Sequence, residues 1–362
     1  MRDGFPAASM HAMTMFPTHE SRRSGAANAA VRAGLARVGA VVFARRITAL
    51  VLLCLAWMQA AAAAEPAQLR IGYQKAVSSL VLAKQHRLLE QRFPRTRISW
   101  VEFPAGPQLL EALNVGSIDL GGAGDIPPLF AQAAGADLLY VGWVPPTPKA
   151  ETILVPARST LRRVADLKGK RVAFQKGSSA HNLLLRLLAR SGLSMRDITP
   201  LYLSPANARA AFAAGQVDAW AIWDPWYSAL TLDGSARLLA NGEGLGLTGG
   251  FFLSSRRYAT AWGPFVQQVM GTLNQADGLL ERDRAGSIKT LAQVSGLSPA
   301  VVERTLAHRP PASVQPLSAQ VIKAQQATAD LFFAQRLLPK RVLVAPAVWR
   351  APASVAAQAA AK

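Results

Sequence analysis

Cysteine is almost absent from this chain of 362 residues, in which Cys54 is the only one. Cys54 lies inside an apolar run and follows the bulky Leu53, whereas a lipid-modified cysteine follows a small residue. The sequence beyond this run therefore offers no disulfide bond, no thiol nucleophile and no cysteine ligand for a metal.

Acidic residues are scarce. The chain has 40 Lys and Arg residues against 21 Asp and Glu, a formal net charge of +19. Such an excess favours nucleic acid, anionic lipid or small anionic solutes as partners, or reflects a compositional bias towards Arg. No run of basic residues interleaved with aromatic residues occurs, and we expect no nucleic acid partner. Charge alone does not choose among the other anions.

Long apolar runs are limited to one, at residues 47–58, which follows the pair Arg45 and Arg46. About 12 apolar residues are too few for a membrane anchor, which needs roughly 20. With the Ala-rich residues 60–64 behind it, this run predicts a signal peptide over 45–64, cleaved near Ala64, and export to the periplasm. The paired arginines leave the Sec and twin-arginine routes both open. Residues 1–44 are interpreted as disordered, or as lying upstream of the true start.

Strand-like and helix-like segments alternate through the rest of the chain, which predicts α/β lobes with parallel sheets. The pattern is interrupted near residue 150 and again near residue 250, where we expect the chain to cross between two lobes. Residues 249–253 are predicted to return to the first lobe as a strand. The predicted parts are 65–152 (first lobe), 153–250 (second lobe), 251–345 (first lobe, mostly helical) and 346–362 (flexible tail).

One stretch, residues 171–186, combines a short apolar strand, a polar turn and a helix. The turn contains Gly177, Ser178 and Ser179, and the helix runs from Ala180 to a stop at residues 191–192. A helix that starts behind such a turn presents free backbone N–H groups to an anion. An ordinary serine N-cap is the alternative interpretation.

Two further strand-to-helix turns are predicted at residues 121–125 and 223–227. The glycines of the first turn would let a ligand approach the backbone, or would simply make a tight turn. No Lys-Ser/Thr pair follows them, so this turn is not a phosphate-binding P-loop. Because ligands of parallel α/β sheets bind at the carboxyl ends of strands, these turns predict a small-molecule site.

Catalytic candidates are few. Beyond the signal region the histidines are His86, in a predicted surface helix, His181, and His308, in a Pro-rich turn where we expect solvent exposure. His181 is either a base or, as we prefer, a neutral hydrogen-bond partner. No metal-ligand spacing is present. We therefore expect neither an enzyme nor a cofactor.

The chain contains six distinctive motifs, at residues 71–75, 98–107, 116–120, 124–128, 174–182 and 218–225. Together they resemble the aliphatic sulfonate-binding proteins of bacterial ABC importers, a family whose wider membership binds taurine, nitrate and thiamine precursors. The resemblance spans residues 68–345. It implies a two-lobed periplasmic binding protein type II fold with two interlobe crossings and the ligand in the cleft. It also implies capture of an alkanesulfonate by a monomer and delivery to a membrane permease for sulfur acquisition.

The resemblance also implies the ligand contacts. Donors are expected from two turns, and Trp223 with Asp224 would border the organic part of the ligand, although Trp223 is equally interpretable as core and Asp224 as a lobe-closing residue. Departures at residues 76–77 and 122–123 leave taurine, nitrate or a sulfate ester as alternatives, beside an enzyme of the same fold. The implied ligand-binding residues are Gln74, Gly124, Asp125, Gly177, Ser178, Ser179, His181, Trp223 and Asp224.

Overall fold

Two five-stranded sheets organise the computed structural model, which describes residues 65–309 and 313–350. Both sheets lie in one unit that begins at Ala64. The first lobe contains the sheet β2-β1-β3-β10-β4, and the second lobe contains the sheet β7-β6-β8-β5-β9. The strands are β1 Gln68–Tyr73, β2 Arg97–Glu102, β3 Leu120–Gly124, β4 Leu138–Val144, β5 Glu151–Pro156, β6 Arg171–Phe174, β7 Thr199–Tyr202, β8 Ala219–Trp223, β9 Ala236–Asn241 and β10 Gly250–Ser255.

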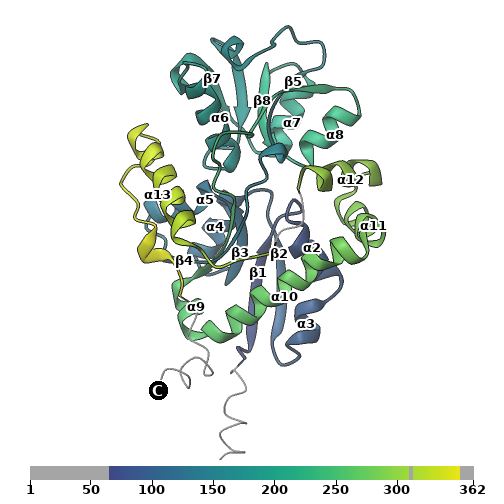
Figure 1. Cartoon of the computed structure of the whole chain (residues 1–362), viewed down its shortest axis with the longest axis vertical. Helices are drawn as coiled ribbons and strands as arrows, with labels where there is room; N and C mark the ends of the chain where they lie inside the picture. The colour runs from purple at the N-terminus through teal and green to yellow at the C-terminus, as the bar shows by residue number, and fades with distance from the viewer. Residues whose placement is uncertain (1–64, 310–312, 351–362) are drawn as a thin grey trace, which may run out of the picture. The chain divides into compact units, whose positions relative to one another are not determined.

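Helices cover both faces of the first sheet, so its central strands are buried on two sides and read as nearly continuous apolar runs (Figure 1). One face packs against α2 and α10, and the other against α4, α5 and α13. The helices are α2 Ser78–Gln85, α3 Leu88–Arg92, α4 Gly106–Asn114, α5 Ile126–Ala133, α6 Ser179–Arg190, α7 Pro205–Ala213, α8 Trp226–Leu232, α9 Arg256–Ala261, α10 Gly263–Arg282, α11 Arg284–Ser295, α12 Pro299–His308 and α13 Ala319–Ala334, with short 3₁₀ turns η1 Pro148–Ala150, η2 Val164–Leu167, η3 Met195–Asp197 and η4 Ala345–Ala347.

The sheets are mixed, which corrects the prediction of purely parallel sheets. Strand β10 runs antiparallel to β3 and β4, and β5 runs antiparallel to β8 and β9. These are the first strands after each crossing between the lobes, so the chain enters each sheet against the direction of its neighbours. The two predicted crossings are confirmed, since β4 leads to β5 and β9 leads to β10.

The predicted turn at residues 121–125 is largely a strand. Residues Gly121 to Gly124 belong to β3 and pair with β10. A Cβ at Gly121 would lie 2.8 Å from Leu109 Cδ2 and 2.9 Å from the carbonyl oxygen of Gly72. Glycine is therefore required here by close packing within a strand, and turn formation begins only at Asp125.

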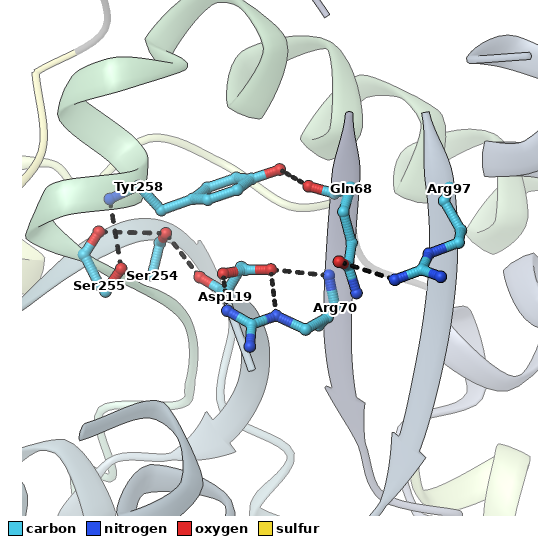
Figure 2. A network of polar contacts seen from close by, with 7 residues as sticks. All are labelled: Gln68, Arg70, Arg97, Asp119, Ser254, Ser255 and Tyr258. Carbon is cyan, nitrogen blue, oxygen red and sulfur yellow. Dashed lines mark hydrogen bonds and ion pairs between the residues drawn. The ribbon is translucent and has the colours of Figure 1, made fainter. Parts of the chain in front are cut away.

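Each sheet is anchored by an Arg–Asp pair, and the two pairs make the same contacts. In the first lobe the backbone N–H and the guanidinium of Arg70 donate to Asp119, with Nη2 to Oδ1 at 2.6 Å (Figure 2). The carbonyl oxygen of Asp119 accepts from the Ser254 hydroxyl of β10 at 2.8 Å. In the second lobe Arg171 makes the same contacts with Asp218, at 2.8 Å and 2.9 Å. The repeated pair aligns the strands whose carboxyl ends point to the cleft.

One helix after β10 contacts both lobes, because α12 packs in the core of the first lobe and also on α8 of the second lobe. Residues 346–350 of the predicted tail lie beside β4. Val348 bridges to Tyr140, and the Trp349 N–H donates to the carbonyl oxygen of Tyr140 at 3.0 Å. The predicted extension and signal peptide, residues 1–64, lie outside the described residues, as do residues 351–362. None of the helices in the described ranges has the length and apolarity to cross a membrane.

Candidate ligand-binding site

A cavity of about 210 Å³ lies between the two lobes. Its lining comes from the carboxyl ends of β3 and β8, the start of α6, the two crossings, and the helices α2, α10 and α12. Of the residues predicted to bind a ligand, six line this cavity: Gln74, Gly124, Asp125, Ser178, Ser179 and Trp223.

The start of α6 faces the cavity, as the strand-turn-helix pattern predicts. Strand β6 is buried except for Arg171, and Gly177 reverses the chain with a φ of 74°. Ser178 then takes the N-cap position in extended conformation, but its hydroxyl donates to the Gln175 carbonyl at 2.7 Å and does not cap the helix. The Ser178 N–H donates to the Gln175 carbonyl and the His181 N–H to the Ser178 carbonyl, so within the described structure the N–H groups of Ser179 and Ala180 remain available to an anion.

Ser179 contacts both lobes. Its hydroxyl donates to Glu151 Oε1 at 2.8 Å within the second lobe. Across the cleft, a Cβ on Gly124 would lie 3.0 Å from the Ser179 Cβ. Glycine at position 124 therefore lets the end of β3 approach the start of α6 closely.

Asp125 is 2% exposed. It occupies the N-cap position of α5, but its side chain points to α6 and does not cap α5. Oδ2 accepts from Asn182 Nδ2 at 2.6 Å, while Oδ1 has no hydrogen bond within the described protein. The backbone carbonyl of Asp125 accepts from Gln325. Burial raises the pKa of this carboxyl to about 6. The Asp125–Asn182 bond thus joins the two lobes behind the cavity.

Gln74 and Trp223 occupy opposite lobes of the cavity wall. Gln74 Nε2 donates to the carbonyl oxygen of Gly122 at 2.9 Å, which fixes the loop after β1 against β3. Trp223 is the last residue of β8 and is 7% exposed, so most of its ring packs in the core of the second lobe. Trp223 is therefore a core side chain that also borders the cavity, and its contact with the organic part of a ligand stays a prediction.

Three predicted residues, Gly177, His181 and Asp224, do not line the cavity. The Gly177 N–H donates to His181 Nδ1 at 3.3 Å, so it is not free for a ligand. The His181 ring is fully buried against Phe174 and Phe332, at centroid distances of 4.9 and 5.2 Å. Burial lowers the His181 pKa to about 4, which keeps the ring neutral. His181 is a packed hydrogen-bond acceptor and not a base in the cleft.

Asp224 instead joins α8 to α12. Its Oδ1 accepts from the Ser228 N–H at 2.9 Å, and its Oδ2 lies 2.7 Å from His308 Nδ1. The His308 ring also stacks on Tyr227 at a centroid distance of 4.9 Å. This corrects the prediction of a solvated His308, whose side chain is only 17% exposed.

Sequence reasoning missed three charged residues that line the cavity: Glu151, Asp277 and Arg309. Arg309 is the one basic side chain among the described lining residues, and its guanidinium donates to the carbonyl oxygens of Ala76 at 2.6 Å and of Asp224 at 3.2 Å. Burial raises the pKa of Glu151 to about 8 and that of Asp277 to about 7. No local motif surrounds these three residues, and only the long-range fold brings them together.

This arrangement can bind a small anion without catalysing a reaction. The helix N-terminus, two serine residues and one arginine provide donors, and the described lining contains no histidine, cysteine or cluster of metal ligands. Aromatic and aliphatic side chains, Trp223, Phe252, Leu280 and Leu306 among them, cover the remaining wall. Two α/β lobes joined by two crossings around such a cavity define a two-lobed solute-binding protein.

Comparisons with known proteins agree with this class. The family model described as NMT1/THI5 like matches residues 101–240. An aliphatic sulfonates-binding protein of Escherichia coli (strain K12) is 57% identical over 299 residues, 83% of this chain and 94% of the relative. The chain belongs to the family of aliphatic sulfonate-binding proteins.

Two solved structures share the fold over most of the chain. The alkanesulfonate-binding protein SsuA from Xanthomonas axonopodis pv. citri, bound to MOPS, is 96% identical with a TM-score of 0.79, covering 80% of this chain and 100% of that chain. The periplasmic aliphatic sulphonate binding protein SsuA from Escherichia coli is 58% identical with a TM-score of 0.75, covering 80% and 94%. The resemblance inferred from the six motifs is confirmed.

Proposed function

We propose that this protein binds an aliphatic sulfonate in the interlobe cavity and delivers it to the membrane permease of an ABC importer, for sulfur acquisition. The observation that carries the proposal is the N-terminal turn of α6, with Ser178 and Ser179, facing the same cavity as Arg309. A sulfonate is a permanent monoanion whose three oxygens only accept hydrogen bonds, so this donor set is complementary to it.

The expected hydrogen-bond energies are large enough for micromolar binding of a sulfonate. Hydrogen bonds to a charged group contribute about 1.5–3 kcal/mol each, and micromolar affinity needs roughly 8 kcal/mol after the cost of ordering. Three or four donors around the head group reach this range. The apolar wall, with Trp223 and Leu306, would cover an alkyl tail.

Export supports the same role. A signal peptide cleaved near Ala64 would place the binding protein in the periplasm, the location named for the similar Escherichia coli structure. We propose that it acts there as a monomer, because each lobe must move freely as the cleft opens and closes.

Calorimetric titration of the chain from Glu65 onward tests the proposal. The protein is unfolded and refolded to remove bound ligand, then titrated with ethane- to octanesulfonate, with taurine, nitrate and sulfate as competing candidates. The buffers must contain no sulfonate. We expect one-site binding of alkanesulfonates. Binding of nitrate or taurine alone would leave the fold correct and the ligand wrong, and absence of all binding would contradict the function.

Replacing Ser178 and Ser179 by alanine should weaken binding of the preferred sulfonate about 10-fold or more. On binding, the two hydroxyl groups would turn from the Gln175 carbonyl and from Glu151 to the anion, and each such bond contributes more than about 1 kcal/mol. The matched control is Ser117→Ala, an exposed serine that does not line the cavity. Unchanged affinity in the double variant would show that the hydroxyl groups at the start of α6 do not contact the ligand.

A further inference from the structure

Glu151 is a carboxyl group fixed at the place where the proposed anion would bind. It is the first residue of β5, paired with Trp223 of β8, and its carbonyl oxygen accepts from the Gly242 N–H at 3.0 Å. Its side chain lines the cavity beside Ser178 and Ser179. Oε1 accepts from the Ser179 hydroxyl at 2.8 Å, whereas the buried Oε2 has no hydrogen bond within the described protein.

The groups around Glu151 do not neutralise it by an ion pair. Asp125 faces it from the end of β3 and Asp224 from the end of β8, while Arg309 faces it from beyond α12. Asp277 of α10 lines the same cavity. No salt bridge to Glu151 is found among the described residues. Burial, with Asp125 as a further contributor, raises the pKa of Glu151 to about 8, although Ser179 and Arg309 oppose the shift.

The Ser179 hydroxyl has one hydrogen, and in this structure that hydrogen points to Glu151. An ionised Glu151 would therefore compete with the sulfonate for the Ser179 donor, and would also repel the ligand. A neutral Glu151 removes both conflicts, since its own O–H can donate to Ser179 Oγ or directly to a sulfonate oxygen. In the first case the Ser179 hydrogen becomes free to turn to the ligand.

We propose that Glu151 binds the sulfonate group as a neutral carboxylic acid, so that ligand binding takes up one proton from solvent wherever Glu151 is ionised in the empty cleft. This inference rests on the proposed function, because it requires an anion in the cavity. Ligand binding is then coupled to proton uptake, and the affinity for the ligand is highest when Glu151 is protonated.

The linkage between ligand binding and proton binding sets the direction in which affinity changes with pH. The bound anion favours the protonated acid, so the affinity is constant at low pH and falls as pH rises through the pKa of about 8. Well above that pH the dissociation constant rises by about 10-fold per pH unit for one proton taken up. Asp277 does not share a hydrogen bond with the α6 turn in the described structure, so its titration is not required for this effect.

The test is titration with the preferred alkanesulfonate between about pH 6.5 and pH 9.5, in Tris and in borate, whose different ionisation enthalpies report proton uptake. Glu151→Gln keeps a hydrogen-bond donor on a side chain of the same shape, but the amide does not titrate. We expect this variant to bind at every pH with a dissociation constant that no longer changes. The control Asp277→Asn, another acid in the lining, should keep the fall in affinity at high pH.

A wild-type protein that binds sulfonate with the same affinity and no proton uptake across this range would overturn the inference and leave the function standing. So would loss of binding at every pH by a Glu151→Gln protein that circular dichroism shows to be folded, because the charged carboxylate would then be required. Absence of sulfonate binding by the wild type at every pH would instead reject the function itself, and the inference with it.

Discussion

Single residues decide how closely the two lobes approach at the cavity. Gly124 was predicted only as a backbone donor, but its main constraint is steric, because a Cβ there would meet the Ser179 Cβ at 3.0 Å. Contacts of this kind displace neighbours and cost about 1–3 kcal/mol in a packed site. The closed arrangement of the cleft therefore depends on the absence of a side chain at this position.

Gly124→Ala should weaken sulfonate binding by about 5- to 100-fold, while the thermal midpoint of the ligand-free protein changes little, since an open cleft relieves the contact. Calorimetric titration and thermal unfolding of the same sample separate the two effects. Gly122→Ala, in the same strand, is the matched control, because its Cβ would lie 3.5 Å from Leu80 and Phe252, an ordinary contact. Equal losses in both variants would refute the steric account.

Residue types and positions in this site were predictable from sequence, but side-chain directions were not. Ser178 and Ser179 line the cavity as predicted, whereas Gly177, one residue earlier, gives its N–H to His181. Whether these residues contact a ligand stays a prediction. Glu151 and Arg309 were missed because nothing near them in sequence marks them, and only the two crossings bring them to the same cavity.

At the scale of elements, strands and helices followed from local apolar patterns because each pattern reports burial along its own segment. The strand β3 was the exception. Its glycines are typical of a turn, yet they pack against Leu109 and the backbone of Gly72, and this tertiary requirement overrides the low strand preference of glycine. The strand directions after each crossing also could not be derived, since periodicity carries no information on pairing.

The contact between α8 and α12 leads to a prediction about His308. Removing its ring by His308→Ala leaves Asp224 Oδ2 buried without its partner, and takes away the stacking on Tyr227. The free energy of unfolding should fall by about 1–3 kcal/mol, the cost of an unsatisfied buried group. Urea denaturation measures it, with His86→Ala, an exposed histidine at the end of α2, as control. Equal stability of both variants would mean that this contact contributes nothing.

Across the whole molecule, buried titratable groups act with opposite signs on stability. Burial raises the pKa of Asp125 to about 6, of Asp277 to about 7 and of Glu151 to about 8, so the folded protein keeps protons that the unfolded chain releases near pH 4. These acids make stability fall as pH rises from about 4 to about 8. Burial lowers the pKa of His181 from 6.5 to about 4, so this group makes stability rise with pH between about 4 and about 6.5.

As pH rises above about 6.5, the pKa of an unfolded histidine, the His181 contribution fades, and Asp277 and Glu151 dominate among the buried groups named above. We therefore expect the free energy of unfolding of the ligand-free protein to decrease between about pH 6.5 and pH 8.5, and then to level off. Urea denaturation at intervals across this range measures the decrease. Glu151→Gln should remove the part of the decrease near pH 8, and Asp277→Asn the part near pH 7, because the amide groups do not titrate. A wild-type stability that stays constant or increases over this range would show that neither carboxyl is held neutral by its burial in the cleft.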